Sequence, residues 1–283
     1  MVVVYSARLA NHTNQGIRMM LLKFSPANAK LKHLEPLVGG KVFSFSTLAG
    51  VTCPYAKECE SKAVLGDDNR LHIVDGPHTV FRCFSASQEV LFKLVYAQRK
   101  YNMDMLATCG NKVDKLVELI QSSLPVKAKC IRLHVSGDFG TYNYFLAWLE
   151  IARKNPNILF YAYTKSIPFW VKSINDIPEN MVLTASRGGY KDNLIDEYKL
   201  RNVTVVHEPE ECMLVVKAKN KNKMPKGSRY AGMPIDHNDS FACLPKHRNT
   251  NFVLLVHAIQ PKGSEASKGE SILNGLGSYS KGK

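Results

Sequence analysis

Short apolar strands alternate with amphipathic helices along most of the chain. Residues 129–135 and 157–163 are apolar runs typical of buried strands, and residues 142–153 between them repeat apolar positions at helical spacing. The same alternation predicts further strands at 41–48, 181–185, 203–207 and 252–258, and helices at 85–101, 112–122, 169–175 and 192–200. About six strands with intervening helices favour an α/β fold with a parallel sheet, doubly wound or curled into a (β/α) barrel or partial barrel; we expect the barrel or partial barrel.

The chain divides into three parts around this alternation. Residues 1–40 lack a clear period and are predicted to be an N-terminal extension packed on the barrel. Residues 41–262 are predicted to form the barrel-like domain, with a basic insertion at 213–250 that we interpret as a mobile loop or inserted hairpin before the last strand. Residues 263–283, rich in Gly, Ser and Lys, are predicted to be a partly flexible tail with a short helix near 266–273.

Length and charge narrow the class of protein. The 283 residues suffice for one large domain with its own core. The formal net charge is +14, and a positive field attracts phosphates, so we expect a nucleic acid as partner, DNA more than RNA. No apolar run approaches the length of a membrane span, and the N-terminus lacks a basic leader, so we expect no membrane partner and a cytoplasmic location.

The cysteines are the strongest chemical signal. Cys53 and Cys59 share one loop after the first strand of the alternation, and Cys83 follows in the next segment. Thiolates bind zinc and iron–sulfur clusters, and the five residues between Cys53 and Cys59 are more than zinc sites usually have. We therefore predict an iron–sulfur cluster or zinc on Cys53, Cys59 and Cys83, with Cys243 as a fourth ligand. The alternative is that these are separate buried thiols.

Polar residues follow several predicted strands, and the carboxyl ends of parallel strands meet at one edge of a sheet. Asp138 follows the strand at 129–135, where a carboxylate can act as a base or nucleophile. Its alternative role is to cap the helix that begins near Tyr142. The predicted catalytic residues are Asp138, Lys165, Arg187 and His257, and the predicted cofactor-binding residues are Ser136, Gly137 and Ser186.

Two polar segments lie in the basic insertion. Residues 236–239 combine two aspartates, a histidine and an asparagine, which we interpret as a turn with Asx hydrogen bonds; metal binding or proton transfer is the alternative. A basic run is predicted either to clamp a phosphate backbone or to be a solvated loop. Its predicted nucleic-acid-binding residues are Lys217, Lys219, Lys221, Lys223, Lys226 and Arg229.

Several motifs, taken in order, resemble the phage gene product 88 family. They are Thr52–Cys59, Phe81–Ser87, His134–Phe139, Phe160–Ser166, Leu183–Gly189, Ile235–Asp239 and Gln260–Ser264. The resemblance covers roughly residues 23–273 and implies a phage-encoded protein in the cytoplasm of the infected host cell.

Two more distant likenesses concern mechanism. A cysteine loop after the first strand and a Ser-Gly-Asp turn after the second are similar to radical S-adenosylmethionine enzymes. That likeness implies a partial (β/α) barrel, a four-iron cluster on three cysteines and a use of S-adenosylmethionine, although Cys83 lies downstream of the usual compact cysteine loop. Asp138 also resembles the strand-end aspartates of tRNA-guanine transglycosylases, which implies base exchange.

The preferred prediction is a phage-encoded enzyme that modifies bases in nucleic acid, with DNA preferred over RNA as the substrate. It has a cysteine-ligated metal or iron–sulfur centre at the barrel mouth. One alternative is a transglycosylase that inserts a modified 7-deazaguanine into DNA with Asp138 as the catalytic carboxylate. The other is a non-enzymatic DNA-binding protein with a structural metal.

Overall fold

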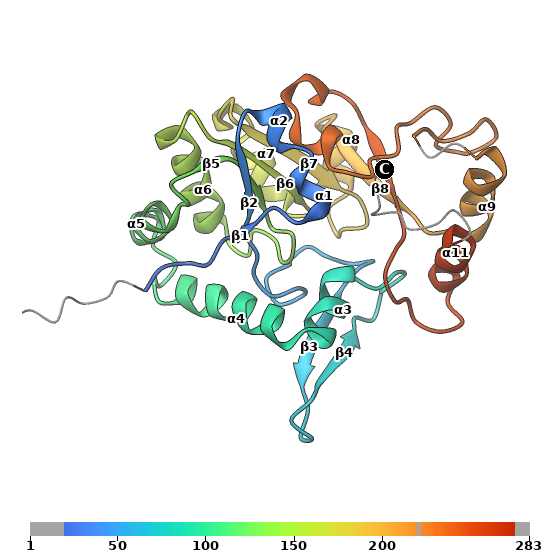
Figure 1. Ribbon diagram of the computed structural model, residues 1–283, viewed down its shortest axis with the longest axis horizontal. Helices are drawn as coiled ribbons and strands as arrows, with labels where there is room; N and C mark the ends of the chain where they lie inside the picture. The colour runs from blue at the N-terminus through green and yellow to red at the C-terminus, as the bar shows by residue number, and fades with distance from the viewer. Residues whose placement is uncertain (1–19, 220–221, 275–283) are drawn as a thin grey trace, which may run out of the picture.

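A curled sheet of seven strands forms the centre of the protein (Figure 1). The computed structural model describes residues 20–219 and 222–274. In spatial order the strands are β1 (Ser25–Pro26), β2 (Lys41–Ser44), β5 (Ala128–Leu133), β6 (Leu159–Thr164), β7 (Met181–Ser186), β8 (Asn202–Val206) and β9 (Phe252–Leu255). β1 is antiparallel to β2, and all the other neighbours are parallel. The predicted α/β class and mostly parallel, curled sheet are confirmed, and the N-terminal segment adds one short antiparallel strand at its edge.

Alternate residues of each strand point to opposite faces, so the two faces of the sheet have different cores. On one face, Ile131 and Leu133 of β5 pack with α5 (Val113–Ser123) and α6 (Tyr142–Lys154); we call it the helix face. On the other face, Cys130 of β5 packs with Leu31 and Leu34 near the N-terminus. We call this second face the cavity face.

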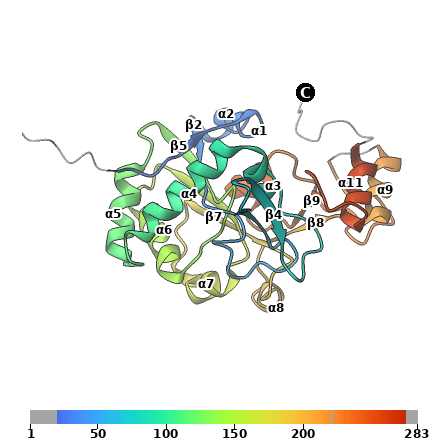
Figure 2. The ribbon, with the colours of Figure 1, turned by 90° about the horizontal axis from the view of Figure 1, so that it is seen from below.

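The remaining helices surround these two faces. They are α1 (Ala29–Lys32), α2 (Glu35–Val38), α3 (Phe84–Leu91), α4 (Lys93–Ala107), α7 (Ile167–Lys172), α8 (Asn193–Glu197), α9 (Pro209–Ala218), α10 (Ser240–Cys243) and α11 (Glu265–Asn274). Short 3-10 turns follow at Ile174–Asp176 and Pro245–His247. Helices α9 and α11 lie side by side at one end of the molecule (Figure 1 and Figure 2).

Two expectations need correction, and one element was not predicted. The single helix predicted at 85–101 is two helices, because Phe92 takes an extended conformation with φ −123° and ψ 93° between α3 and α4. The hairpin of β3 (Ser61–Leu65) and β4 (Leu71–Asp75) was absent from the prediction; it lies below the sheet beside α3 in Figure 1. The basic insertion begins inside α9, so its first residues are helical and not a loop. Within the described residues, no helix combines the length and the apolar character needed to cross a membrane.

Candidate functional site

A cavity of about 720 Å³ lies on the cavity face of the sheet, a volume in the range of small-molecule sites. Its lining comes from segments far apart in the sequence: the N-terminal segment with Lys30, the loop after β2, helices α3 and α4, and the ends of β5, β6, β7 and β9. Because the parallel strands all end on this side, the turns that follow them bring their polar side chains to one place.

Cys53, Cys59 and Cys83 all line this cavity, and each is partly exposed. Burial raises the pKa of the Cys53 thiol well above its usual value, and the carboxyl of Asp138 and the other two thiols raise it further. Burial likewise raises the pKa of Cys83 to about 11, with a smaller contribution from Cys59. The three thiols are therefore close enough to influence one another and are protonated in the protein as it stands.

These thiols do not form a complete ligand set by themselves. Across residues 20–219 and 222–274, no group of three or more Cys, His, Asp and Glu side chains is arranged to hold a metal ion. The structure thus brings the predicted cysteines into one cavity without gathering them around one point.

Cys243 lies elsewhere. Its sulfur is 3.6 Å from the sulfur of Cys130, and both residues are fully buried in the core of the cavity face with Tyr161 and Phe252. Cys243 is not among the residues that line the cavity, so the structure does not bring this predicted ligand together with Cys53, Cys59 and Cys83.

The loop that carries Cys53 and Cys59 is held by the turn after β7. The backbone N–H groups of Lys57 and Glu58 donate to the carbonyl of Gly188, and Ala56 forms an antiparallel bridge with Gly189. Gly188 has φ +89°, and a Cβ there would lie 2.6 Å from the carboxylate of Glu58. This positive φ favours glycine, and the hydrogen bonds from Lys57 and Glu58 join the turn to the cysteine loop.

Arg187, in the same turn, does not face the cavity. Its guanidinium binds the carboxylate of Asp196 and the side-chain oxygen of Asn202. The structure therefore does not bring the Arg187 side chain together with the other predicted catalytic residues: it joins the turn to α8 and β8, and its backbone carbonyl accepts a hydrogen bond from Lys165.

Asp138 lines the cavity and is almost fully buried. One carboxylate oxygen accepts the Thr164 hydroxyl at 2.6 Å and the Phe139 N–H at 2.7 Å, and the other accepts the Lys165 N–H at 2.7 Å. Burial raises the pKa of Asp138, and these hydrogen bonds oppose the rise. Thr141, and not Asp138, caps α6, because its hydroxyl accepts the Tyr144 N–H. Asp138 instead joins the ends of β5 and β6.

Four other predicted site residues line the cavity with Asp138: Ser136, Gly137, Lys165 and Ser186. The ammonium of Lys165 donates to the hydroxyl of Ser186 at 2.9 Å and to its carbonyl at 3.2 Å. Ser136 donates to Glu89 at 2.8 Å. Gly137 has φ +79°, and a Cβ there would collide with the hydroxyls of Thr47 and Thr52, so this turn also requires glycine.

His257 forms part of an aromatic wall of the cavity. Its ring centroid lies 5.1 Å from that of Phe84, with 38° between the planes. Burial lowers the pKa of His257, and the charges of Lys30 and Arg132 contribute in the same direction. The imidazole is therefore neutral near pH 7.

Three charged residues of the cavity face were absent from the predicted site. The carboxylate of Asp239 binds Arg132 at 2.5 Å and Lys30 at 3.1 Å, and it accepts the Tyr161 hydroxyl at 3.0 Å. One signal was available: Arg132 is a charged residue inside the otherwise apolar strand β5. The expected turn at 236–239 does contain an Asx hydrogen bond, from the Asn238 N–H to Asp236, but Asp239 points to the cavity instead.

The basic run lies apart from the cavity lining. Lys217 is on α9 and Lys219 caps it, whereas Lys221 lies outside the described residues. Arg229 is bound by Glu208 and Glu211. Lys223 and Lys226 follow on the connection from α9 to α10.

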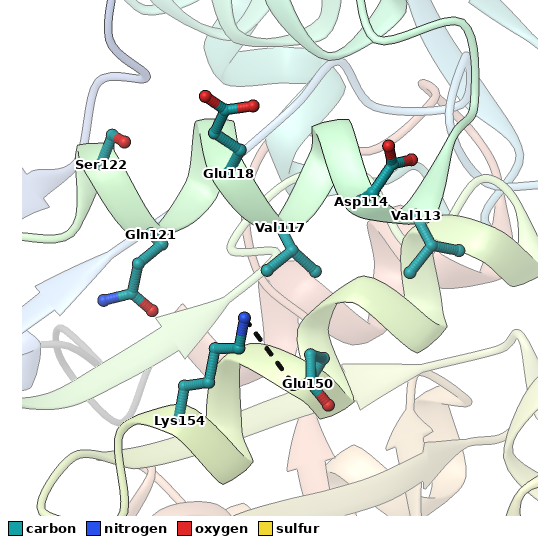
Figure 3. A pocket seen from close by; sticks show the side chains of 8 residues that line it. All are labelled: Val113, Asp114, Val117, Glu118, Gln121, Ser122, Glu150 and Lys154. Carbon is teal, nitrogen blue, oxygen red and sulfur yellow. Dashed lines mark ion pairs between the residues drawn. The ribbon is translucent and has the colours of Figure 1, made fainter.

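A second depression, of about 770 Å³, is a groove between α5 and α6 (Figure 3). Val113 and Val117 form its apolar part, and Lys154 pairs with Glu150 at 3.8 Å across its edge. No cysteine or histidine is among its lining residues in the described chain, so it does not resemble the chemistry of the first cavity.

Comparison with known proteins identifies the family. A family model described as Gene product 88 matches residues 19–271, which is most of the chain. No curated protein and no solved structure matches the chain.

Proposed function

This chain belongs to the phage gene product 88 family, and we propose that it is a metalloenzyme that modifies bases in nucleic acid. We propose DNA in preference to RNA as the substrate. Cys53, Cys59 and Cys83 would hold zinc or an iron–sulfur cluster at the carboxyl ends of the strands. One observation carries the proposal: three thiols from two separate segments line a single cavity of substrate size, beside a buried carboxyl and an ammonium group.

The donor set fits a soft metal. Thiolates are the ligands that zinc and iron–sulfur clusters share, and a metal displaces thiol protons even where the pKa is raised. Cys53, Cys59 and Cys83 are all partly exposed and line the same cavity, so a metal ion that enters the cavity meets all three thiols. When bound, a centre with three protein ligands supplies an open position for substrate or for S-adenosylmethionine.

The other lining residues have separate tasks in this proposal. Lys165 places a positive charge beside Asp138 and near Cys59, where it favours the thiolate form. The neighbouring rings of Phe84 and His257 give the cavity an aromatic wall against which a planar base can pack. Such a base must leave the helical stack of the nucleic acid to enter the cavity.

The experiment is metal analysis with an absorption spectrum of the full chain purified without oxygen. The wild type is expected to bind zinc or iron stoichiometrically, and Cys53→Ser, Cys59→Ser and Cys83→Ser are each expected to lose most of it. Cys243→Ser is the matched control and keeps it, because that thiol faces Cys130. A wild type without metal, or equal loss in Cys243→Ser, contradicts the proposal.

The base-exchange alternative requires Asp138 as nucleophile. Its two oxygens already accept three hydrogen bonds, which favours a positioning role. In this alternative, Asp138→Asn abolishes incorporation of a modified guanine into DNA and leaves the metal content unchanged, as nucleoside mass spectrometry would show.

The DNA-binding alternative rests on the net charge of +14. It predicts salt-dependent binding with no chemical change in the DNA. Replacing Lys217, Lys219, Lys223 and Lys226 with Gln is then expected to lower the salt slope by about one for each phosphate that is no longer bound. Modified nucleosides in DNA treated with the protein would rule this alternative out.

A further inference from the structure

We infer that Arg132 and Lys30 form a subsite for an oxyanion, a carboxylate or a phosphate, carried by a small molecule in the cavity. The inference deepens the proposed function, on which it rests for the identity of the chemistry, by naming the class of molecule that the same cavity takes. Both residues line the cavity, and neither belongs to the group of cysteines.

The lining of the cavity carries more positive than negative side chains. Two carboxyl groups line it, those of Asp138 and Asp239. The cationic lining residues are Lys30, Arg82, Arg99, Arg132 and Lys165. An excess of cations around an enclosed space favours a negatively charged ligand.

Two of these cations have acids of their own. Arg82 binds Asp75 at 2.5 Å, and Arg99 binds Glu89 at 3.0 Å. Their charges are therefore compensated within the protein. The Lys165 ammonium is held by the Ser186 hydroxyl and by the carbonyls of Ser186 and Arg187, near the cysteines. Lys30 and Arg132 remain as the pair of cations that lie together.

Lys30 and Arg132 share a single carboxylate, that of Asp239. Burial opposes ionisation of Asp239, but Arg132 and Lys30 hold its pKa at about 2, so it carries only one negative charge against two positive ones. Asp236 is close in sequence to Asp239 but does not line the cavity. The carboxylate oxygens of Asp236 accept the backbone N–H groups of Asn238 and Ala242.

The Arg132 guanidinium belongs to the wall of the cavity, and the residue is 8% exposed. Its Nη1 binds Asp239, and its Nε is buried within the protein without a hydrogen-bond partner among the described residues, so a ligand meets the remaining edge of the guanidinium. An oxyanion is the partner that a guanidinium binds best. The hydroxyl of Ser44, the Cα partner of Arg132 on β2, lines the same part of the cavity and adds a further donor.

The position of the pair indicates a small molecule and not the backbone of a polymer. Arg132 is the second-last residue of β5 and is only 8% exposed, so the subsite belongs to the buried wall of the cavity. When a flipped nucleotide enters a cavity, its base goes in first and its phosphates stay at the rim. An anion bound inside therefore belongs to a separate substrate, close to His257, whose pKa the charges of Lys30 and Arg132 lower.

The test compares ligands that differ in their anionic group. The phosphate arm uses the four 2′-deoxynucleoside 5′-monophosphates against their nucleosides, and the carboxylate arm uses S-adenosylhomocysteine against 5′-methylthioadenosine. Calorimetry at constant ionic strength is expected to show, in one arm, about tenfold to a hundredfold tighter binding of the anionic member. The arm that responds identifies the oxyanion.

Variants separate an anion site from a structural role. Arg132→Gln is expected to abolish the preference, whereas Asp239→Asn strengthens it, because both cations then lack their acid. Arg153→Gln on α6, which pairs with Glu150 on the surface, is the matched control and changes nothing. If Arg132→Gln does not fold by circular dichroism, Lys30→Met, with a side chain 24% exposed, replaces it.

The inference is overturned if neither arm shows a preference in the wild type. It also fails if the preference survives in Arg132→Gln, or falls in Asp239→Asn as it does in Arg132→Gln. Metal content measured on the same samples distinguishes the two proposals. A metal-loaded protein without an anion preference contradicts only the subsite, and an anion preference without bound metal contradicts only the metalloenzyme.

Discussion

The helix face and the cavity face of the sheet are built from alternate residues of the same strands, yet they are stabilised differently. On the helix face, Trp148 of α6 packs among the rings of Phe45, Tyr144 and Phe160 without any ion pair in that cluster of described residues. On the cavity face, Arg132 follows Ile131 in β5, and its guanidinium forms an ion pair with the carboxylate of Asp239.

The difference shows where this fold can accommodate chemistry. Close-packed rings leave no space, and their stability comes from apolar area removed from water. Buried ion pairs contribute little net stability, because desolvation offsets their attraction, but they hold charge in a defined place beside an open volume. We therefore expect substitutions on the helix face to change stability alone, and substitutions on the cavity face to change binding as well as stability.

The largest expected effect is on the helix face. Trp148 is fully buried, so Trp148→Ala is expected to lower the free energy of unfolding by about 3–5 kcal/mol. Urea unfolding measures the loss, and the metal content of the folded fraction is expected to stay unchanged. A loss of metal without a loss of stability would break the division between the faces.

On the cavity face, Arg132→Met leaves the buried Asp239 without its closest cation and is expected to cost about 3 kcal/mol. Adding Asp239→Asn to Arg132→Met is expected to recover part of this loss, because the unpaired charge disappears. The same urea series measures both. A double variant whose loss equals the sum of the two single losses would show that the pair is not coupled.

The turn between the two faces is tested at Gly137. Gly137→Ala is expected to lower stability by about 1–3 kcal/mol, because φ is +79° and a Cβ meets the hydroxyls of Thr47 and Thr52. Gly110→Ala is the matched control, since Gly110 has φ +58° and open space within 4 Å of its Cβ position. Equal losses in the two variants would show that the collision at Gly137 is relieved.

The smallest effect concerns a titratable group that lies between the two faces, since His134 lines the cavity and its ring also packs against residues of the helix-face core. The ring of His134 packs on Phe139 and Tyr144, and burial lowers its pKa to about 3. The folded protein keeps His134 neutral while the unfolded chain protonates near pH 6.5, so its contribution is present above pH 6.5 and is lost as the pH falls. Between pH 6.5 and 5.5 this loss is expected to be about 1 kcal/mol.

His134→Asn removes this contribution and suits the backbone, because φ at this position is +55°. Burial raises the pKa of Asp236 to about 6, so its contribution to stability changes with pH in the opposite direction. This contribution is the same in the wild type and in His134→Asn, so it cancels when their free energies of unfolding are compared. Chemical unfolding at several pH values measures the difference. Parallel pH profiles for the two proteins would contradict the assignment to His134.

Local patterns predicted much of the fold. The strands at 157–163 and 181–185 correspond to β6 and β7, and the helix at 142–153 to α6, because each apolar period reports which residues are buried. The break at Phe92 was not predicted, since Phe92 continues the helical apolar pattern and its extended backbone depends on tertiary packing. The β3–β4 hairpin lacks strong apolar alternation and was missed for that reason.

The sequence by itself determined the alternation of strands and helices, the cysteines after the first long strand and the glycines at the turns, because local spacing and backbone conformation are written in neighbouring residues. Only the tertiary structure decided which distant groups meet. It placed Cys83 with Cys53, turned Cys243 toward Cys130, and joined Arg132 to Asp239 across 107 residues of chain. Such pairings depend on how the sheet curls and on which loop reaches across it, and no local pattern encodes either.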